Sequence, residues 1–252
     1  MNWLTFVVVA VFFGATLIRS ALGFGEALIA VPLLSFVLPV EVAAPVAVLV
    51  SITVAAVVVA QDWRHVHLRS AAWLVISTLA GIPLGLLMLR TVSEPMVKAV
   101  LGALVAAFAA SGLRGRTRHQ LTNDRWAWLF GVSAGVLGGA YGMNGPPLVA
   151  YGTLRRWSPE HFRATLQGYF LPASLIGMIG YRAAGLWTPT VSRYYLLSLP
   201  MVLLAIPLGR ALNRRLDTQR FLVFVHAALL ASGAGLVFQS IVTAVARQSL
   251  VR

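Results

Sequence analysis

Two glycine-rich segments interrupt long apolar stretches of the sequence. The first reads RSALGFGE (residues 19–26) and the second reads GGAYGMNGPP (residues 138–147). Glycine lets the backbone approach a ligand without an intervening side chain. A Pro-Pro pair is typical of a helix start, where free N–H groups and the helix dipole attract anions. The paired breaks therefore predict an anion-binding site, and close packing of membrane helices is the alternative explanation for the same residues.

Charged and amide side chains beside these breaks are the candidates for contacting such an anion. Arg19 is close enough to the first break either to pair with the anion or to extend to the membrane interface. Glu26 is a candidate proton-carrying carboxylate or a partner for Arg19. The SPE sequence at residues 158–160 has the residue types of a helix start, so Arg163 and Gln167 share one helix face, although Arg163 alternatively anchors the cytoplasmic end of that helix. The predicted substrate-binding residues are Arg19, Ser20, Gly23, Phe24, Gly25, Glu26, Tyr141, Gly142, Met143, Asn144, Gly145, Arg163 and Gln167.

Other polar residues give weaker signals. His226 lies within the last apolar stretch, where it either relays protons or bonds to a neighbouring helix. Asp62, His65 and His67 fit a solvated loop with Trp63 as an interfacial anchor. The sequence has no HExxH or Walker pattern, no paired-His metal pattern and no cysteine. It therefore predicts no catalytic residue, metal ligand or cofactor, and the chain is expected not to be an enzyme.

The composition places these residues in a membrane protein. Of 252 residues, 59% are hydrophobic and 11% are charged, and the mean hydropathy is +0.83, more apolar than a water-soluble fold can hide. Runs such as 3–18, 42–60 and 221–238 reach or approach the roughly 20 residues that cross a bilayer. They lack the alternation of barrel strands, so helices are expected. No Lys or Arg precedes the first run, which is therefore expected to be retained and not cleaved as a signal.

The net charge of +13 comes from Lys and Arg residues that are spread through the loops. They do not form one basic face with interleaved aromatic residues. The pattern indicates anchoring by the positive-inside rule and no nucleic-acid partner. The expected partners are the lipid bilayer and a small anion, and the exposed aromatic and glycine-rich faces permit a homodimer without requiring one.

The two breaks belong to an internal repeat. GFG (residues 23–25) matches GMN (142–144) at an offset of 119 residues, which also relates Glu41 to Glu160, and GIPLG (81–85) matches AIPLG (205–209) at an offset of 124. We divide the chain into a first transmembrane repeat (1–113), a cytoplasmic linker (114–124), a second transmembrane repeat (125–243) and a C-terminal tail (244–252). Each half is expected to contain one span, a break, a short apolar stretch and three more spans, which gives 8 to 10 membrane segments.

The basic loops predict how the halves are oriented. If the short stretches (27–38 and 146–154) return the chain to the side it came from, 13 arginines share one face and six basic residues share the other; otherwise the split is nearly even. The 13 are Arg64, Arg69, Arg114, Arg116, Arg118, Arg125, Arg155, Arg156, Arg163, Arg210, Arg214, Arg215 and Arg220, and the six are Arg90, Lys98, Arg182, Arg193, Arg247 and Arg252. The uneven arrangement makes the halves inverted-topology repeats, a transporter signature, and puts both termini outside the cytoplasm.

The residues around both breaks also resemble a known family. RSALGFGEALIAVPLL (19–34) and GMNGPPLVAYGTLRRWSPEHFRATLQ (142–167) resemble the glycine-rich motifs of the sulfite exporter TauE/SafE family, which is built from duplicated halves, and the likeness covers essentially the whole chain. The resemblance implies export of sulfite or of a small organosulfonate such as sulfoacetate. Many relatives have a glycine where Glu26 stands, which leaves open whether Glu26 touches substrate or replaces a coupling group.

We therefore expect an all-α secondary transporter of the inner membrane that encloses one anion near the midplane and works by alternating access. A sulfonate stays anionic at physiological pH and presents three acceptor oxygens, which suit Arg19, Arg163 and the helix N-termini. Protons, sodium ions and the membrane potential alone are all open as the driving force. An anion channel and a non-transporting membrane assembly subunit are the alternative functions.

Overall fold

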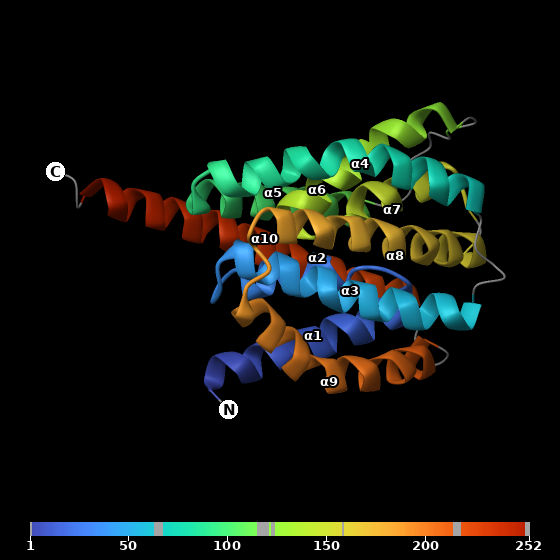
Figure 1. The fold of residues 1–252 in the computed structure, drawn as a ribbon, viewed down its shortest axis with the longest axis horizontal. Coiled ribbons are helices and arrows are strands. Elements are labelled where there is room, and N and C mark those ends of the chain that lie inside the picture. Colours follow the sequence, from blue (N-terminus) through green and yellow to red (C-terminus); the bar gives the residue numbers. More distant parts are fainter. Residues whose placement is uncertain are drawn as a thin grey trace.

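Helices make up the architecture of the chain (Figure 1). The computed structural model describes residues 2–62, 68–114, 121, 124–157, 159–213 and 218–249. The helices in chain order are α1 (Trp3–Leu22), α2 (Glu26–Leu34), α3 (Val40–Asp62), α4 (Leu68–Thr91), α5 (Glu94–Leu113), the 3-10 turn η2 (Asp124–Trp126), α6 (Ala127–Tyr141), α7 (Gly145–Leu154), α8 (Pro159–Ala183), α9 (Pro189–Asn213) and α10 (Thr218–Ser249). No strand occurs in the part of the chain so described.

Six of the described helices, α1, α3, α4, α5, α9 and α10, are long and apolar enough to cross a membrane. Their outer faces carry large apolar side chains, among them Leu87 with 60% and Phe238 with 69% of the surface exposed. Water does not stabilise such faces over whole helices, whereas lipid does. The prediction of an all-α polytopic membrane protein is confirmed.

Each half of the chain contains the same order of helices: one that ends at a glycine break, a short one and three long ones. α1 ends at Gly23 and α6 at Gly142, with left-handed φ values of 88° and 66°, which glycine adopts without strain. The short helices α2 and α7 have 9 and 10 residues and are about 15 Å long, too short to cross the bilayer. The first short stretch was predicted to reach Leu38, but α2 ends at Leu34 and residues 35–37 form turns. Pro39 disfavours helical backbone at Leu38, so the helix does not resume before it.

Equivalent helices of the two halves run in opposite directions along the long axis of the molecule (Figure 1). α1 and α3 both lead away from the end that carries the two termini, so α2 must bring the chain back between them. α6 and α8 run the opposite way, and α10 returns the chain to the end where it began. This is the geometry that oppositely oriented halves would have.

Glycines let α4 lie directly against α6, and α1 against α9. A Cβ atom at Gly85 of α4 would meet the backbone of residues 136 and 140 in α6, and one at Gly209 of α9 would meet the backbone of residues 17 and 21 in α1. The offset of 124 relates the two glycines, and the offset of 119 relates their neighbours. The sequence repeat therefore corresponds to a repeat of tertiary contacts.

Gly135→Ala is expected to loosen the packing of α4 on α6. The added methyl group would fall on the carbonyl oxygen of Thr78 and 3.0 Å from the amide nitrogen of Ile82, and neither backbone group can move alone. Overpacking of this kind costs about 1–3 kcal/mol, so the purified variant should melt at a lower temperature in detergent. Gly14→Ala, whose methyl group has nothing within 4 Å, is the control, and equal melting of the two variants would contradict the close contact.

Candidate anion-binding site

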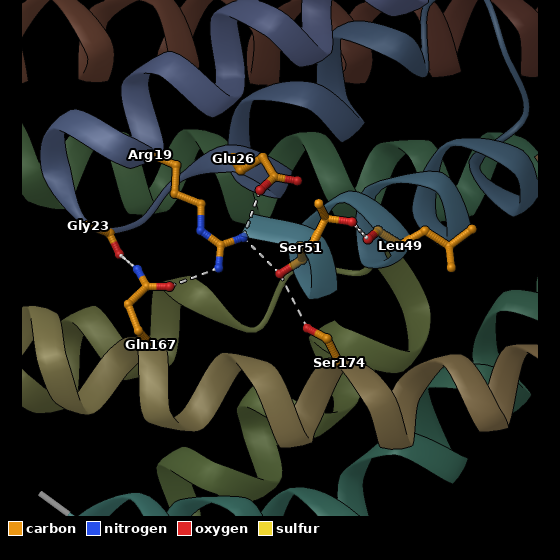
Figure 2. Close-up of polar contacts among 8 residues, drawn as sticks. Arg19, Gly23, Glu26, Leu49, Ser51, Gln167 and Ser174 are labelled. Atoms are coloured by element: carbon orange, nitrogen blue, oxygen red, sulfur yellow. Dashed lines mark hydrogen bonds and ion pairs between the residues drawn. The ribbon is translucent and has the colours of Figure 1, made fainter. Parts of the chain in front are cut away.

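Arg19 is the centre of a buried polar cluster (Figure 2). Its side chain leaves the last turn of α1 and is 3% exposed. Nη1 donates to Glu26 Oε2 at 2.7 Å, at the first residue of α2, and to Ser51 Oγ at 2.9 Å in α3. Nη2 donates to Gln167 Oε1 at 3.1 Å in α8. Three residues that the sequence singled out, Arg19, Glu26 and Gln167, are thus in one cluster.

Three residues of α8 belong to the cluster. Gln167, Phe170 and Ser174 lie at i, i+3 and i+7, so they share one face of α8. The Gln167 amide donates from Nε2 to the carbonyl oxygen of Gly23 at 2.8 Å, while the Phe170 ring lies 5.0 Å from the Arg19 guanidinium carbon. Ser174 Oγ donates to Ser51 Oγ at 3.3 Å. α8 therefore contacts both the Arg19 guanidinium and the backbone of the glycine break that follows α1.

A small cavity of about 20 Å³, with room for about one water molecule, lies beside this cluster. Both glycine breaks line it, together with Arg19, Glu26, Ser51 and Phe170. The lining residues are Arg19, Phe24, Gly25, Glu26, Ala27, Leu28, Ser51, Gly142, Met143, Asn144, Gly145 and Phe170. The N-termini of α2 and α7, one from each half, therefore meet at a single cavity that holds a guanidinium group.

The two helix N-termini differ in the donors that they offer. In α2 the first N–H to bond back is that of Ile29, to the Gly25 carbonyl oxygen at 3.0 Å, so three preceding N–H groups have no partner within the helix. In α7 the second and third residues are prolines without N–H groups. α7 therefore contributes the N–H of Gly145 and the positive end of its dipole, and fewer N–H donors than the sequence suggested.

Some glycines at the breaks allow helices to pack closely, and others leave open space beside the cavity. A Cβ atom at Gly142 would come within 2.9 Å of the Ala44 carbonyl oxygen, so this position needs glycine for the contact of α6 with α3. A Cβ atom at Gly25 or Gly145 would have nothing within 4 Å, and both residues line the cavity; Gly25 also has a φ of 102°, which by itself favours glycine. The two explanations of the breaks, packing and ligand access, therefore apply to different glycines.

Several predicted site residues lie beside the cavity without lining it. Tyr141 is buried, and its hydroxyl group donates to the Val97 carbonyl oxygen at 3.1 Å, in α5. Ser20 is 6% exposed and lies in the last turn of α1, and Gly23 contributes its carbonyl oxygen to Gln167. Arg163 is in the first turns of α8, and its side chain is outside the described part of the structure, as are Asp62 and the loop with His65 and His67.

Three members of the site, Ser51, Phe170 and Ser174, were not among the residues singled out from the sequence. Ser51 is the one hydroxyl residue in the otherwise apolar run VAVLVSI at residues 46–52. Phe170 and Ser174 follow Gln167 at helical spacing, which is the signal that would have found them. An isolated serine in a membrane helix otherwise bonds to its own helix backbone, so the sequence gives it no distinct function.

Not every hydrogen-bonding group of the cluster is satisfied by the protein. Arg19 Nε, Ser20 Oγ and Glu26 Oε1 are buried and have no hydrogen-bond partner. Guanidinium has five N–H donors, of which three are accounted for above. Buried polar groups in lipid are expensive to leave unpaired. An oxyanion with acceptor lone pairs would satisfy the Nε–H of Arg19, whereas Glu26 Oε1 is itself an acceptor and needs a donor. No group of three or more His, Asp and Glu side chains that could hold a metal ion occurs among the described residues.

His226 lies on the other side of the first break. It lines a second, smaller cavity of about 10 Å³, together with Phe24, Gly25 and Leu28. Its ring stacks on Phe108 of α5, with ring centroids 5.8 Å apart. The backbone of the break therefore separates His226 from the cavity that holds Arg19.

Gln167→Leu is expected to destabilise the protein, because it removes the acceptor for Arg19 Nη2 and the donor for the Gly23 carbonyl oxygen. Leaving buried groups unpaired costs about 1–3 kcal/mol each, which should lower the melting temperature in detergent. Gln61→Leu, at an exposed position of α3, makes the same change of side chain and should have little effect. If both variants melted alike, Gln167 would not brace the cluster.

Known proteins that resemble this chain identify its family. A model of the family described as "Sulfite exporter TauE/SafE" matches residues 8–236, which include both breaks. The chain is also 26% identical over 201 residues to a Cupriavidus necator protein named "Probable sulfite/organosulfonate exporter TauE", an alignment that covers 77% of this chain and 78% of the relative. No solved structure matches the chain. The match over nearly the whole length shows that this chain belongs to the sulfite exporter TauE/SafE family.

Proposed function

We propose that this protein is a secondary transporter that exports a small sulfur-containing anion, sulfite or an organosulfonate such as sulfoacetate, across the inner membrane. The observation that carries the proposal is the guanidinium of Arg19 buried in a cavity where the α2 and α7 N-termini meet. The family of exporters and the name of the Cupriavidus necator relative support a sulfur anion as cargo.

The chemistry of the cavity suits a sulfonate or sulfite group. Such a group presents three oxygens in a compact cluster, and each accepts hydrogen bonds. The N–H groups at the start of α2, the Gly145 N–H and the Nε–H of Arg19 are donors for these oxygens, and the dipoles of both helices favour the negative charge. Phe24, Met143 and Phe170 supply apolar walls for a short carbon chain.

Alternating access is the mechanism that the arrangement of the halves favours. Each half contributes one broken helix pair to the cavity, and equivalent helices run in opposite directions. A rocking of one half against the other would then open the cavity first to one membrane face and then to the other. The glycine contacts of α4 with α6 and of α1 with α9 present smooth backbone surfaces along which such a motion can occur.

The orientation in the membrane follows from the positions of the loops. The C-terminal ends of α3, α5, α7 and α9 lie at one end of the molecule, and the start of α1 and the end of α10 lie at the other (Figure 1). Of the 13 arginines counted in the sequence, eight lie at described helix ends or turns on the first side: Arg69, Arg114, Arg125, Arg155, Arg156, Arg163, Arg210 and Arg220. The positive-inside rule therefore supports a cytoplasmic position for this end and an outside position for both termini.

Single cysteines test this orientation, because the chain has none of its own. Asn2→Cys and Thr190→Cys, both at exposed positions, should react with a membrane-impermeant maleimide in intact cells. Arg114→Cys, at the exposed end of α5, should react only after the cells are opened. The reverse labelling pattern would place the termini in the cytoplasm and overturn the assignment.

Anion binding by the purified protein in detergent tests the function. Sulfite, sulfoacetate, taurine, sulfate, formate and chloride are compared by the rise in melting temperature that each produces. We expect sulfite or a sulfonate to stabilise the parent by about 2.7 kcal/mol at a concentration 100 times its Kd. Arg19→Lys keeps the charge but loses the planar fork of donors, and should weaken binding about 10-fold or more.

Arg182→Lys is the matched control for this experiment. Arg182 is exposed at the end of α8 and lies over the Trp187 ring, far along the helix from the cavity. This variant should bind anions like the parent. If no anion stabilises the parent, or if both arginine variants bind equally well, the cavity beside Arg19 is not the substrate site.

A further inference from the structure

We infer that Glu26 is a tethered anion that competes with the substrate for Arg19, so that each singly charged substrate anion crosses the membrane together with one proton. This inference rests on the proposed function and names its coupling ion. It starts from the charge of the cavity. Arg19 and Glu26 are 3% and 1% exposed and form an ion pair of 2.7 Å, so the cavity without substrate is electrically neutral.

Glu26 occupies the position that suits a substrate oxyanion. Its carboxylate lies at the first residue of α2, where the helix dipole favours negative charge, and it lines the same cavity as Arg19. The fold does not require an acid here, because the residue related to Glu26 by the offset of 119 is Gly145, at the start of α7. The start of a short helix in this repeat therefore does not need a carboxylate, and we assign the Glu26 carboxylate to the chemistry of the cavity.

The bonds of Glu26 also permit it to take up a proton. Oε2 accepts from Arg19, whereas Oε1 is buried without a hydrogen-bond partner. A proton on Oε1 displaces no existing bond and removes the negative charge that neutralises Arg19. The guanidinium is then free to pair with the substrate anion.

Other titratable groups near Glu26 are few. α2 packs against α1, α3, α5, α7 and α10. Among the described side chains that line the two cavities beside Glu26, those with a titratable or charged group are Arg19 of α1 and His226 of α10; Ser51 of α3, Asn144 before α7 and Phe108 of α5 carry no charge. Glu26 is therefore the carboxylate in position to exchange with the substrate.

Electrostatics then fixes the stoichiometry. Two states of the cavity are neutral: ionised Glu26 with no substrate, and protonated Glu26 with one bound monoanion. The state with both anions and the state with neither leave an uncompensated charge in the membrane interior, which is strongly unfavourable. If only the neutral states interconvert between the two membrane faces, the proton is taken up with the anion on one side and released with it on the other. Transport of a monoanion is then electroneutral and independent of the membrane potential.

Methanesulfonate tests the inference, because its charge stays the same from pH 5 to pH 8. The apparent Kd of the parent should rise about 10-fold for each unit of pH where Glu26 is ionised in the free protein. Glu26→Gln should bind methanesulfonate with no such dependence and at least as tightly at high pH. Glu26→Asp, which keeps a carboxylate, should retain the dependence even if it binds less well.

Two control variants identify the responsible group. Glu94→Gln removes a carboxylate that pairs with Lys98 at 3.1 Å on the surface of α5, and His226→Gln removes the neighbouring titratable ring. Both should keep the pH dependence of the parent. In liposomes, a dye that reports internal pH should show proton movement driven by methanesulfonate for the parent, and Glu26→Gln should lose it while still exchanging labelled methanesulfonate.

The outcomes separate the two levels of the proposal. Binding by the parent with the same pH dependence in Glu26→Gln, or with none in the parent, overturns the coupling role of Glu26 and leaves the anion site standing. A loss of the dependence in His226→Gln alone assigns it to that ring and also overturns the inference. No binding of methanesulfonate or of any tested sulfur anion, to the parent or to Glu26→Gln at any pH, overturns the proposed function itself.

Discussion

A guanidinium group inside a membrane protein must be paired, and the pairing of Arg19 determines how the centre of this molecule is built. The hydrocarbon interior provides no water to solvate a charge. Arg19 is therefore bonded to Glu26, Ser51 and Gln167 and covered by Phe170. These partners come from α2, α3 and α8, so one side chain ties the first break to long helices of both halves. The same bonds leave some donors and acceptors unused, and these are the groups that the proposed anion site would use.

The two halves of the repeat have similar backbone arrangements but different side chains at equivalent positions. Both halves place a left-handed glycine at the end of one helix and start a short helix soon after it. The offset of 119, however, relates Arg19 to Gly138, Glu26 to Gly145 and Gln167 to Val48. The first half therefore contributes the ion pair and the second half contributes the amide that braces it. Because only the first half carries the ion pair, we propose one anion site and not two.

Glycine serves two purposes at different positions: it allows close contact between helix backbones, and it leaves open space beside the cavity. The α4/α6 and α1/α9 contacts leave no room for a Cβ atom at Gly85, Gly135 or Gly209. Gly25 and Gly145 have open space around them and border the cavity. Packing glycines bring the helices close enough for the two short helices to meet, and the open glycines then expose the N-termini of these helices. The function of the breaks thus depends on the packing elsewhere in the same helices.

The sequence by itself determined the membrane class, the repeat, the two breaks and the buried charged residues that matter. Hydropathy, glycine and proline preferences and charge are properties of short segments, and they act in the same way wherever the segment lies. Only the tertiary structure decided which polar groups meet. Gln167 reaches Arg19 across 148 positions of sequence and Ser51 reaches it across 32, while the hydroxyl group of Tyr141 is directed to Val97 and away from the cavity. These partnerships arise because helices distant in the chain pack side by side, and the direction of a side chain in such a contact is not encoded in its own segment.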